Sequence, residues 1–240
     1  MEANRESCLR TTSGAILYDA ECLDEPRPSM FAAEHWLARG GALRTSGGRG
    51  TITFMTHDDH RWVLRHYRRG GLAARVLDDT YLWTGEANTR SFVEFRLLQQ
   101  MRAWQLPVPR PVAAAYRRSG RFYRADLITE ELPTRRTLAD ALRHAPVTPG
   151  HWQAIGACIG RFHARGVQHA DLNANNVLLD EDGAVFLLDF DRGRIRERGP
   201  WEAEVLERLR RSLRKVTREL PAGRFGDREW IWLCAGCRGS

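Results

Sequence analysis

Lysine is almost absent from this chain of 240 residues, because 36 of its 37 basic residues are arginines and only Lys215 is a lysine. Long apolar runs are absent too, and no stretch approaches the roughly 20 apolar residues that a helix needs to cross a bilayer. The first residues, Met1 to Glu6, have neither the basic start nor the apolar core of a secretory signal. We therefore expect a cytoplasmic protein without a membrane-spanning helix.

Cysteines are few, and the five that occur are scattered along the chain. Only Cys234 and Cys237 have the spacing of half a zinc site, and no second pair with ligand spacing lies nearby. The pair stands three residues from the end of the chain. We interpret it as part of a frayed, reduced tail.

The composition is that of a soluble globular protein, with 42% hydrophobic and 28% charged residues. The length suits one domain or two lobes with a proper core. A formal net charge of +7 favours an anionic partner. The charge is carried by arginine, which grips carboxylates and phosphates in a bidentate manner. A GC-rich genome would also favour arginine codons, so the charge only supports a functional argument.

The strongest motif lies in the second half of the chain. It runs from His169 to Asn176 as H-A-D-L-N-A-N-N, and Asp189 follows as the start of D-F-D. Two short apolar runs stand between them, joined by Asp182-Gly183, and this pattern predicts a β-hairpin. The hairpin would carry Asn176 and Asp189 to neighbouring ends of one small sheet. The order and spacing are those of the catalytic and metal loops of the protein-kinase-like fold.

Phosphoryl transfer explains these residue types. One carboxylate must face the attacking hydroxyl, and an asparagine with a second carboxylate holds Mg²⁺ against the phosphates of ATP. We predict Asp171 as the catalytic residue and Asn176 and Asp189 as the metal ligands. His169 is expected to brace the loop backbone, and His163, on a packed helix, to be structural.

Upstream, a glycine-rich turn precedes a strand at residues 51–55. Its glycines would let backbone N–H groups approach the phosphates of ATP. The candidates for this contact are Gly47, Gly48 and Gly50.

The next strand, residues 61–67, has Arg65 where protein kinases carry a lysine. A guanidinium keeps its charge, so we predict that Arg65 binds the nucleotide phosphates. A helix is expected from residue 90 or 91 to 104. It carries Glu94, predicted to orient Arg65, with Glu86 as the alternative.

The remaining pattern completes a bilobal α+β fold. A proline-rich segment at 106–112 must be extended, and a strand from residue 122 leads into the joint between the lobes. Backbone groups there are predicted to meet the adenine; the residues are Glu130, Glu131 and Leu132. We therefore expect an N-terminal lobe with an antiparallel sheet (1–132) and a mostly helical C-terminal lobe (133–240).

The segment after Asp191 departs from protein kinases, because no long activation segment ending in A-P-E is present. A basic amphipathic helix from Trp201 to Leu220 stands there instead. This favours a small molecule or lipid as acceptor over a protein. Trp230 and Trp232, beside arginines, suit either a membrane interface or a core.

Taken together, the run from Leu64 to Leu72 (L-R-H-Y-R-R-G-G-L), the H-A-D-L-N run and D-F-D-R-G resemble the 3-deoxy-D-manno-octulosonic acid (Kdo) kinases of Gram-negative bacteria, within the lipopolysaccharide kinase group. The resemblance spans residues 47 to 220. It implies ATP-dependent phosphorylation of the Kdo 4-hydroxyl on Kdo-lipid A. It also implies a peripheral enzyme at the cytoplasmic face of the inner membrane, with an anionic membrane surface and no nucleic acid as partner.

Three alternatives stay open at this point. A heptose kinase of the same group would differ only in its acceptor, and an aminoglycoside-type phosphotransferase shares the catalytic loop. A non-catalytic pseudokinase would bind an anionic membrane or nucleic acid through its basic surface alone. The intact Asp171, Asn176 and Asp189 argue against the last.

Overall fold

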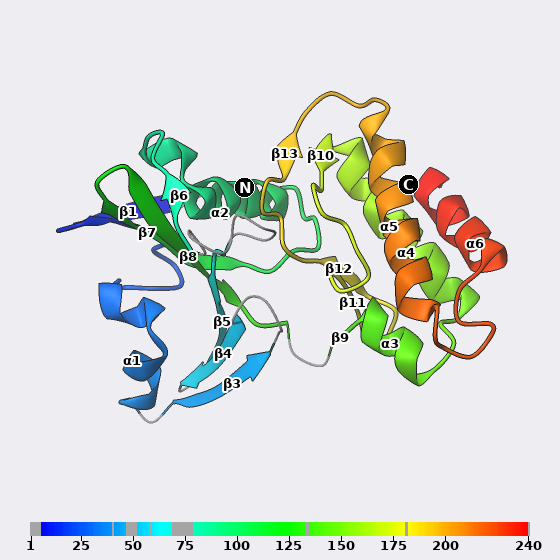
Figure 1. Cartoon of the computed structure of the whole chain (residues 1–240), viewed down its shortest axis with the longest axis horizontal. Helices are drawn as coiled ribbons and strands as arrows, with labels where there is room; N and C mark the ends of the chain where they lie inside the picture. Colours follow the sequence, from blue (N-terminus) through cyan, green and yellow to red (C-terminus); the bar gives the residue numbers. More distant parts are fainter. Residues whose placement is uncertain are drawn as a thin grey trace. The chain divides into compact units, whose positions relative to one another are not determined.

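The computed structural model describes residues 6–39, 41–46, 52–57, 59–68, 79–132, 135–180 and 182–239. The chain divides into two compact units (Figure 1). One contains Met1–Ala103 and Pro109–Glu131, and the other contains Trp104–Val108 and Leu132–Ser240. The first unit is built around an antiparallel sheet and the second is mainly helical, so the predicted α+β class is confirmed.

The sheet of the first unit has eight strands within the described residues, and every neighbouring pair is antiparallel. In spatial order the strands are β1 (Glu6–Thr11), β2 (Gly14–Asp19), β7 (Pro111–Ser119), β8 (Phe122–Glu130), β5 (His60–His66), β4 (Ile52–His57) and β3 (Ala42–Ser46), and β6 (Tyr81–Leu82) also pairs with β8.

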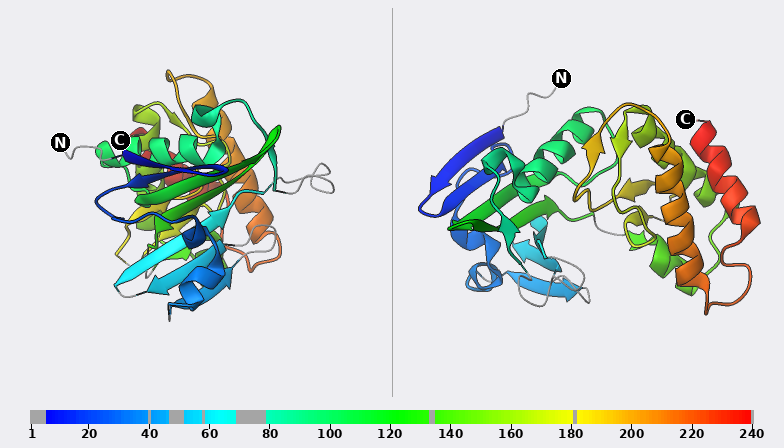
Figure 2. Two further views of the ribbon diagram at one scale, coloured as in Figure 1. Left: turned by 90° about the vertical axis from the view of Figure 1, so that its left-hand side faces the viewer. Right: turned by 45° about the horizontal axis from the view of Figure 1, so that its top comes forward.

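Helices cover both faces of this sheet. On one face α2 (Arg90–Ala103) packs against β7 and β8 (Figure 2). Phe92 of this helix meets the ring of Tyr116 edge-on. Side chains alternate along a strand, so Ala113 and Ala115 of β7 point to the other face. There they meet a cluster supplied by the 3₁₀ helix η1 (Pro28–Phe31) and by α1 (Ala33–Leu37).

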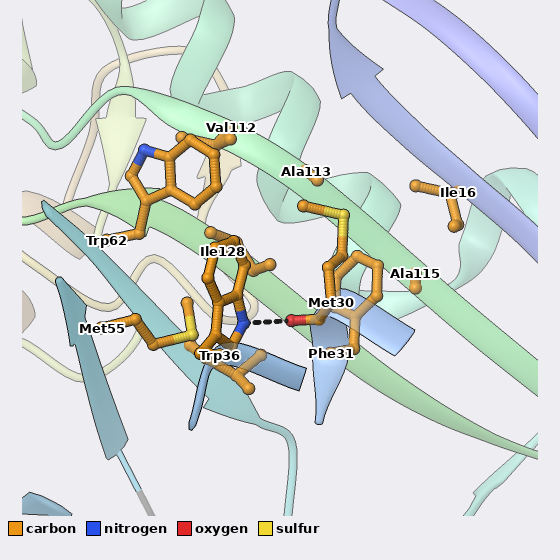
Figure 3. Packing of buried hydrophobic residues seen from close by; sticks show 11 residues of the cluster. Ile16, Met30, Phe31, Trp36, Met55, Trp62, Val112, Ala113, Ala115 and Ile128 are labelled. Atoms are coloured by element: carbon orange, nitrogen blue, oxygen red, sulfur yellow. Dashed lines mark hydrogen bonds between the residues drawn. The ribbon is translucent and has the colours of Figure 1, made fainter. Parts of the chain in front are cut away.

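Two tryptophans dominate that cluster. Trp36 of α1 and Trp62 of β5 meet edge to face with ring centroids 5.3 Å apart. The Trp36 indole N–H donates to the carbonyl oxygen of Met30 at 2.8 Å, so its polar group is satisfied inside the core (Figure 3). This packing fixes β5, which carries the candidate arginine.

In the second unit, α3 and α4 begin at threonine caps and α4 leads toward the candidate catalytic loop. The helices are α3 (Leu138–His144), α4 (Pro149–Ala164), α5 (Trp201–Thr217) and α6 (Asp227–Arg238). Two small sheets accompany them: β9 (Arg136–Thr137), β11 (Val177–Leu179) and β12 (Val185–Leu187) form one, and β10 (Val167–Gln168) with β13 (Arg194–Ile195) forms the other. No helix of the described residues is long and apolar enough to span a membrane.

The end of the chain is not a frayed tail, and that prediction is wrong. Cys234 and Cys237 lie in α6, which packs along α4. Two glycines allow the close approach: a Cβ on Gly156 of α4 would lie 1.9 Å from the carbonyl oxygen of Leu233, and one on Gly236 would lie 2.0 Å from that of Gln153. The two backbones are in contact at this crossing.

We therefore predict that Gly156→Ala or Gly236→Ala lowers the free energy of unfolding by about 2 kcal/mol, because the added methyl group forces the helices apart. Gly150→Ala in the first turn of α4 is the control, since the added Cβ would lie 3.9 Å from its nearest neighbour, the hydroxyl oxygen of Thr148. It is expected to stabilise the helix slightly. Urea unfolding of the three variants measures the effect. Wild-type stability in both crossing variants would contradict the packing.

Candidate active site

A buried histidine organises the loop that follows β10. His169 is 3% exposed. Its Nε2 lies 2.8 Å from the carbonyl oxygen of Leu188, and its Nδ1 accepts from the backbone N–H of Asp171 at 3.1 Å. A carbonyl can only accept, so the proton is on Nε2. Burial lowers the pKa of His169, which keeps this neutral tautomer. As predicted, the histidine braces the loop backbone.

The loop presents Asp171 on the surface. Asn173 and Asn176 both donate their side-chain N–H groups to the backbone carbonyl of Asp171, at 2.9 and 3.0 Å. These two bonds hold the Asp171 backbone while its side chain stays 54% exposed. The Asp171 carboxylate is therefore accessible to a substrate on a rigid support.

The predicted hairpin is present, formed by β11 and β12. Val177 pairs with Leu187, and the N–H of Leu188 donates to the carbonyl of Asn176 at 2.9 Å. Asn176 therefore lies beside the residue that precedes Asp189. Asp189 has φ +60°, a left-handed conformation that aspartate tolerates better than most residues. Phe190 anchors the turn, buried against the rings of Phe162 and His169.

The donor set suits a magnesium ion that also binds phosphates. Because Asn176 uses its N–H₂ group on a backbone carbonyl, its side-chain oxygen is the atom left to bind a cation. With the carboxylate of Asp189 this makes a pair of hard oxygen ligands. In the part of the chain that the structure describes, no cluster of three or more acidic, histidine or cysteine residues could hold a metal alone. Mg²⁺ typically takes one or two carboxylates plus substrate phosphates and water.

In the first unit the structure brings Arg65 and Glu94 together. Glu94 of α2 is only 3% exposed, and one of its oxygens accepts from Arg65 of β5. Tyr67, the residue that follows β5, donates its hydroxyl to that oxygen at 2.6 Å and accepts from Arg65 at 3.0 Å. Burial and then the charge of Glu94 raise the pKa of Tyr67 well above its usual value, so the hydroxyl remains a donor.

His66 serves the sheet and not this cluster. Its Nδ1 bonds the buried carboxylate of Asp126 on β8, which also accepts from Arg117 of β7 at 3.2 Å. The alternative acid Glu86 has different partners, since it accepts from Tyr116 at 2.7 Å and pairs with Arg10. Glu94 is therefore the partner of Arg65.

The other predicted nucleotide residues have mixed outcomes. Gly47, Gly48 and Gly50 lie outside the described residues. The backbone N–H groups of Glu130 and Glu131 donate to the carbonyls of Arg110 and Arg61, both at 2.8 Å, so neither N–H can bind an adenine in this conformation. Glu131 also pairs with Arg44. The contact of Glu130, Glu131 and Leu132 with the adenine stays a prediction.

Comparison with known proteins identifies the family. A model of the lipopolysaccharide kinase (Kdo/WaaP) family matches residues 33–235. A protein of Stenotrophomonas maltophilia (strain K279a) named 3-deoxy-D-manno-octulosonic acid kinase is 46% identical over 211 residues, covering 86% of this chain and 82% of its own. The chain belongs to this lipopolysaccharide kinase family.

Two further relatives carry the same name. The one from Xanthomonas euvesicatoria pv. vesicatoria (strain 85-10) is 47% identical over 206 residues, 85% of this chain and 81% of the relative. The one from Vibrio parahaemolyticus serotype O3:K6 (strain RIMD 2210633) is 40% identical over 206 residues, 86% and 87% of the two chains. The resemblance to the Kdo kinases is confirmed. As a member of a kinase family, the chain is a phosphotransferase with ATP as cosubstrate.

One contact in this lipopolysaccharide kinase was missed by the sequence argument. Arg208 of α5 donates from Nε to an Asp171 carboxylate oxygen at 2.7 Å, and its Nη2 lies 2.6 Å from the same oxygen. The two residues are 37 positions apart. In the sequence, the only indication of this contact was the basic exposed side of the helix. That pattern does not distinguish Arg208 from the other arginines of the helix.

Proposed function

We propose that this family member is an ATP-dependent Kdo kinase that phosphorylates the 4-hydroxyl of Kdo on Kdo-lipid A during lipopolysaccharide core biosynthesis. The observation that carries the proposal is the 40–47% identity to proteins named 3-deoxy-D-manno-octulosonic acid kinase over most of the chain. The braced loop with its exposed Asp171 supports the same chemistry from the geometry of the chain.

In the proposed reaction, Asp171 aligns the acceptor hydroxyl and takes its proton. The hydroxyl oxygen forms a bond to the γ-phosphorus of ATP as the bond to the bridging oxygen of the leaving ADP breaks. Asn176 and Asp189 would hold Mg²⁺, which would neutralise charge on the phosphates. The fixed Asp171 backbone suits such a reaction, because the transfer depends mainly on positioning and electrostatics.

In the first unit, Arg65 takes the part of the kinase lysine on the nucleotide phosphates. Its side chain is 20% exposed and is oriented by Glu94 and Tyr67, and it is proposed to reach the nucleotide from there. Five N–H donors allow one guanidinium to serve the carboxylate and a phosphate together. The glycine turn at Gly47, Gly48 and Gly50 is proposed to cover the same phosphates.

We expect Asp171→Asn to lower kcat by about 10²- to 10⁴-fold, because it removes the base and keeps the side-chain volume. ATP binding should change less than about threefold, since Asp171 is not a proposed ligand of ATP. The assay is transfer of label from γ-labelled ATP to Kdo-lipid A, beside lipid A lacking Kdo and a heptose-bearing core.

Asp182→Asn, at an exposed turn of the hairpin, is the matched control and should keep full activity. Full turnover by Asp171→Asn would remove Asp171 from the reaction. Label only on the heptose core would replace the acceptor and keep the mechanism. Label on no acceptor would favour a non-catalytic protein.

For Arg65 we expect Arg65→Lys to raise the KM for ATP about tenfold, because an ammonium cannot reproduce the planar contacts to Glu94, Tyr67 and a phosphate. Arg65→Ala should raise it further, but it leaves the Glu94 carboxylate buried without its cation and is expected to cost about 3–5 kcal/mol of stability. Steady-state kinetics at varied ATP and varied acceptor separate the two effects.

Arg61→Lys, an exposed change on the same strand, should leave the KM for ATP unaltered. If Arg65→Lys and a folded Arg65→Ala protein both use ATP as the wild type does, the phosphate contact belongs to another cation.

We also propose that the enzyme works at the cytoplasmic face of the inner membrane as a peripheral protein. The support is a basic stripe along α5 and its C-terminal end, formed by Arg211, Lys215 and the C-cap residue Arg218. All three are exposed and stand four and three residues apart, on one side of the helix. The opposite side buries Val205, Leu209 and Leu213. Such cations are attracted to anionic lipid headgroups, by about 1 kcal/mol each near the surface.

Trp230 and Trp232, which the sequence offered for either a membrane interface or a core, pack against side chains of the protein. Trp230 packs against Phe225 and lies beneath the guanidinium of Arg210, and Arg228 covers the ring of Trp232. Both rings are partly buried. The membrane proposal therefore rests on charge.

Replacing the three stripe residues by glutamine should weaken binding to phosphatidylglycerol vesicles at least about tenfold, because three attractive charges are lost. The control triple variant, Arg61, Arg102 and Arg121 to glutamine, removes the same charge from exposed positions of the first unit. Vesicle co-sedimentation at low and high salt measures both. Equal loss in the two variants, or equal binding to neutral phosphatidylcholine vesicles, would contradict the stripe as the membrane surface.

A further inference from the structure

A cavity of about 560 Å³ lies beside the catalytic loop, within the second unit. Its floor includes Gln168, His169 and Ala170, and one side of α5 forms a wall of it. This volume is in the range of small-molecule sites in proteins. Asp171 follows directly after this floor, so a molecule in the cavity would have its reacting hydroxyl close to the Asp171 carboxylate.

Arg208 stands at the junction of the cavity and Asp171. It lines the cavity, and its Nε and Nη2 both hold one oxygen of Asp171 at 2.7 and 2.6 Å. Both side chains are about half exposed, at 48% and 54%. Exposed ion pairs are held weakly, so a ligand carboxylate can take over the guanidinium at small cost. A group that binds Arg208 in this way would also free the Asp171 oxygen.

The other charged groups of the cavity suit an acidic polyhydroxy compound. Arg211 adds a second guanidinium, and its Nη1 lies 4.0 Å from an oxygen of Glu207. Glu204 and Glu207 offer carboxylates that accept hydrogen bonds from sugar hydroxyls. His169 contributes no charge, because it is neutral and bonded to Leu188. The cavity therefore offers cations for one carboxylate and acceptors for several hydroxyls.

We propose that Arg208 is a specificity-determining residue that binds the carboxylate of the acceptor sugar and releases Asp171 to the hydroxyl of the same sugar. This inference rests on the proposed function, since it concerns the acceptor of that reaction. A Kdo residue carries its carboxylate and its 4-hydroxyl on one pyranose ring. An arginine in contact with the catalytic carboxylate is thus placed to bind the first group while Asp171 binds the second.

The test compares two acceptors, Kdo-lipid A and the same glycolipid with its Kdo carboxylate converted to the uncharged methyl ester. The wild type should prefer the acid in kcat/KM by about tenfold or more, as expected for loss of a charge-assisted bidentate pair. Arg208→Gln should raise the KM for the acid by about tenfold, leave the KM for ATP unchanged and abolish the preference. Arg214→Gln, an exposed change on the same helix that does not line the cavity, should keep the preference.

A residue that only orients the Asp171 carboxylate would lower turnover of the acid and the ester alike. Equal use of the two acceptors by the wild type, or an intact preference in Arg208→Gln, would therefore overturn this inference and leave the proposed function standing. Failure of the wild type to phosphorylate either acceptor would overturn the proposed function itself, and the assignment of Arg208 with it. Thermal unfolding of each variant verifies that it is folded.

Discussion

The first unit depends on one buried carboxylate, that of Glu94, having a cation and hydrogen-bond donors beside it. Removing Glu94 from water costs several kcal/mol unless its charge is paired and its oxygens accept hydrogen bonds. Arg65 supplies the charge, and the Tyr67 hydroxyl supplies a second donor to the same oxygen. Because Arg65 lies on β5, Tyr67 follows directly after it and Glu94 lies on α2, the cluster links helix to sheet. It also explains the R-H-Y run, whose middle residue joins β5 to β8 through Asp126 on the other face.

In the second unit the buried polar group is neutral, and it is the imidazole ring of His169. His169 uses both ring nitrogens, one toward the segment before Asp189 and one toward the backbone of Asp171. A protonated ring could not accept the bond from the Asp171 N–H. Burial, which favours the neutral ring, therefore also favours the tautomer that holds the loop. The candidate catalytic loop and the candidate metal loop are thereby joined through one side chain. Rigidity comes from the backbone bonds, and the Asp171 carboxylate remains exposed to its ligands.

Local spacing explains what the sequence could predict. The hairpin between Asn176 and Asp189 follows from two apolar runs and a turn, and Arg65 and Glu94 were paired across 29 residues by the kinase pattern. Contacts that depend on how helices dock were not predictable. Arg208 meets Asp171 only because α5 packs beside the loop. The sequence of α6 was interpreted as a tail because Ala235 and Gly236 give little apolar signal. Gly236 matters because it lets α6 approach the backbone of α4, and that contact cannot be read from the sequence. The edge strand β1, largely exposed, has no clear apolar alternation either.

The arginine at the lysine position also changes how this enzyme can be addressed chemically. Nucleotide analogues with an amine-reactive group modify a kinase through the lysine that touches the phosphates. Arg65 has no such amine, since a guanidinium stays protonated and is a poor nucleophile. The single lysine of the chain lies on the exposed side of α5 and not on β5. If Arg65 contacts the phosphates as proposed, reagents of this kind would label protein kinases in a mixture and leave the nucleotide site of this enzyme unmodified.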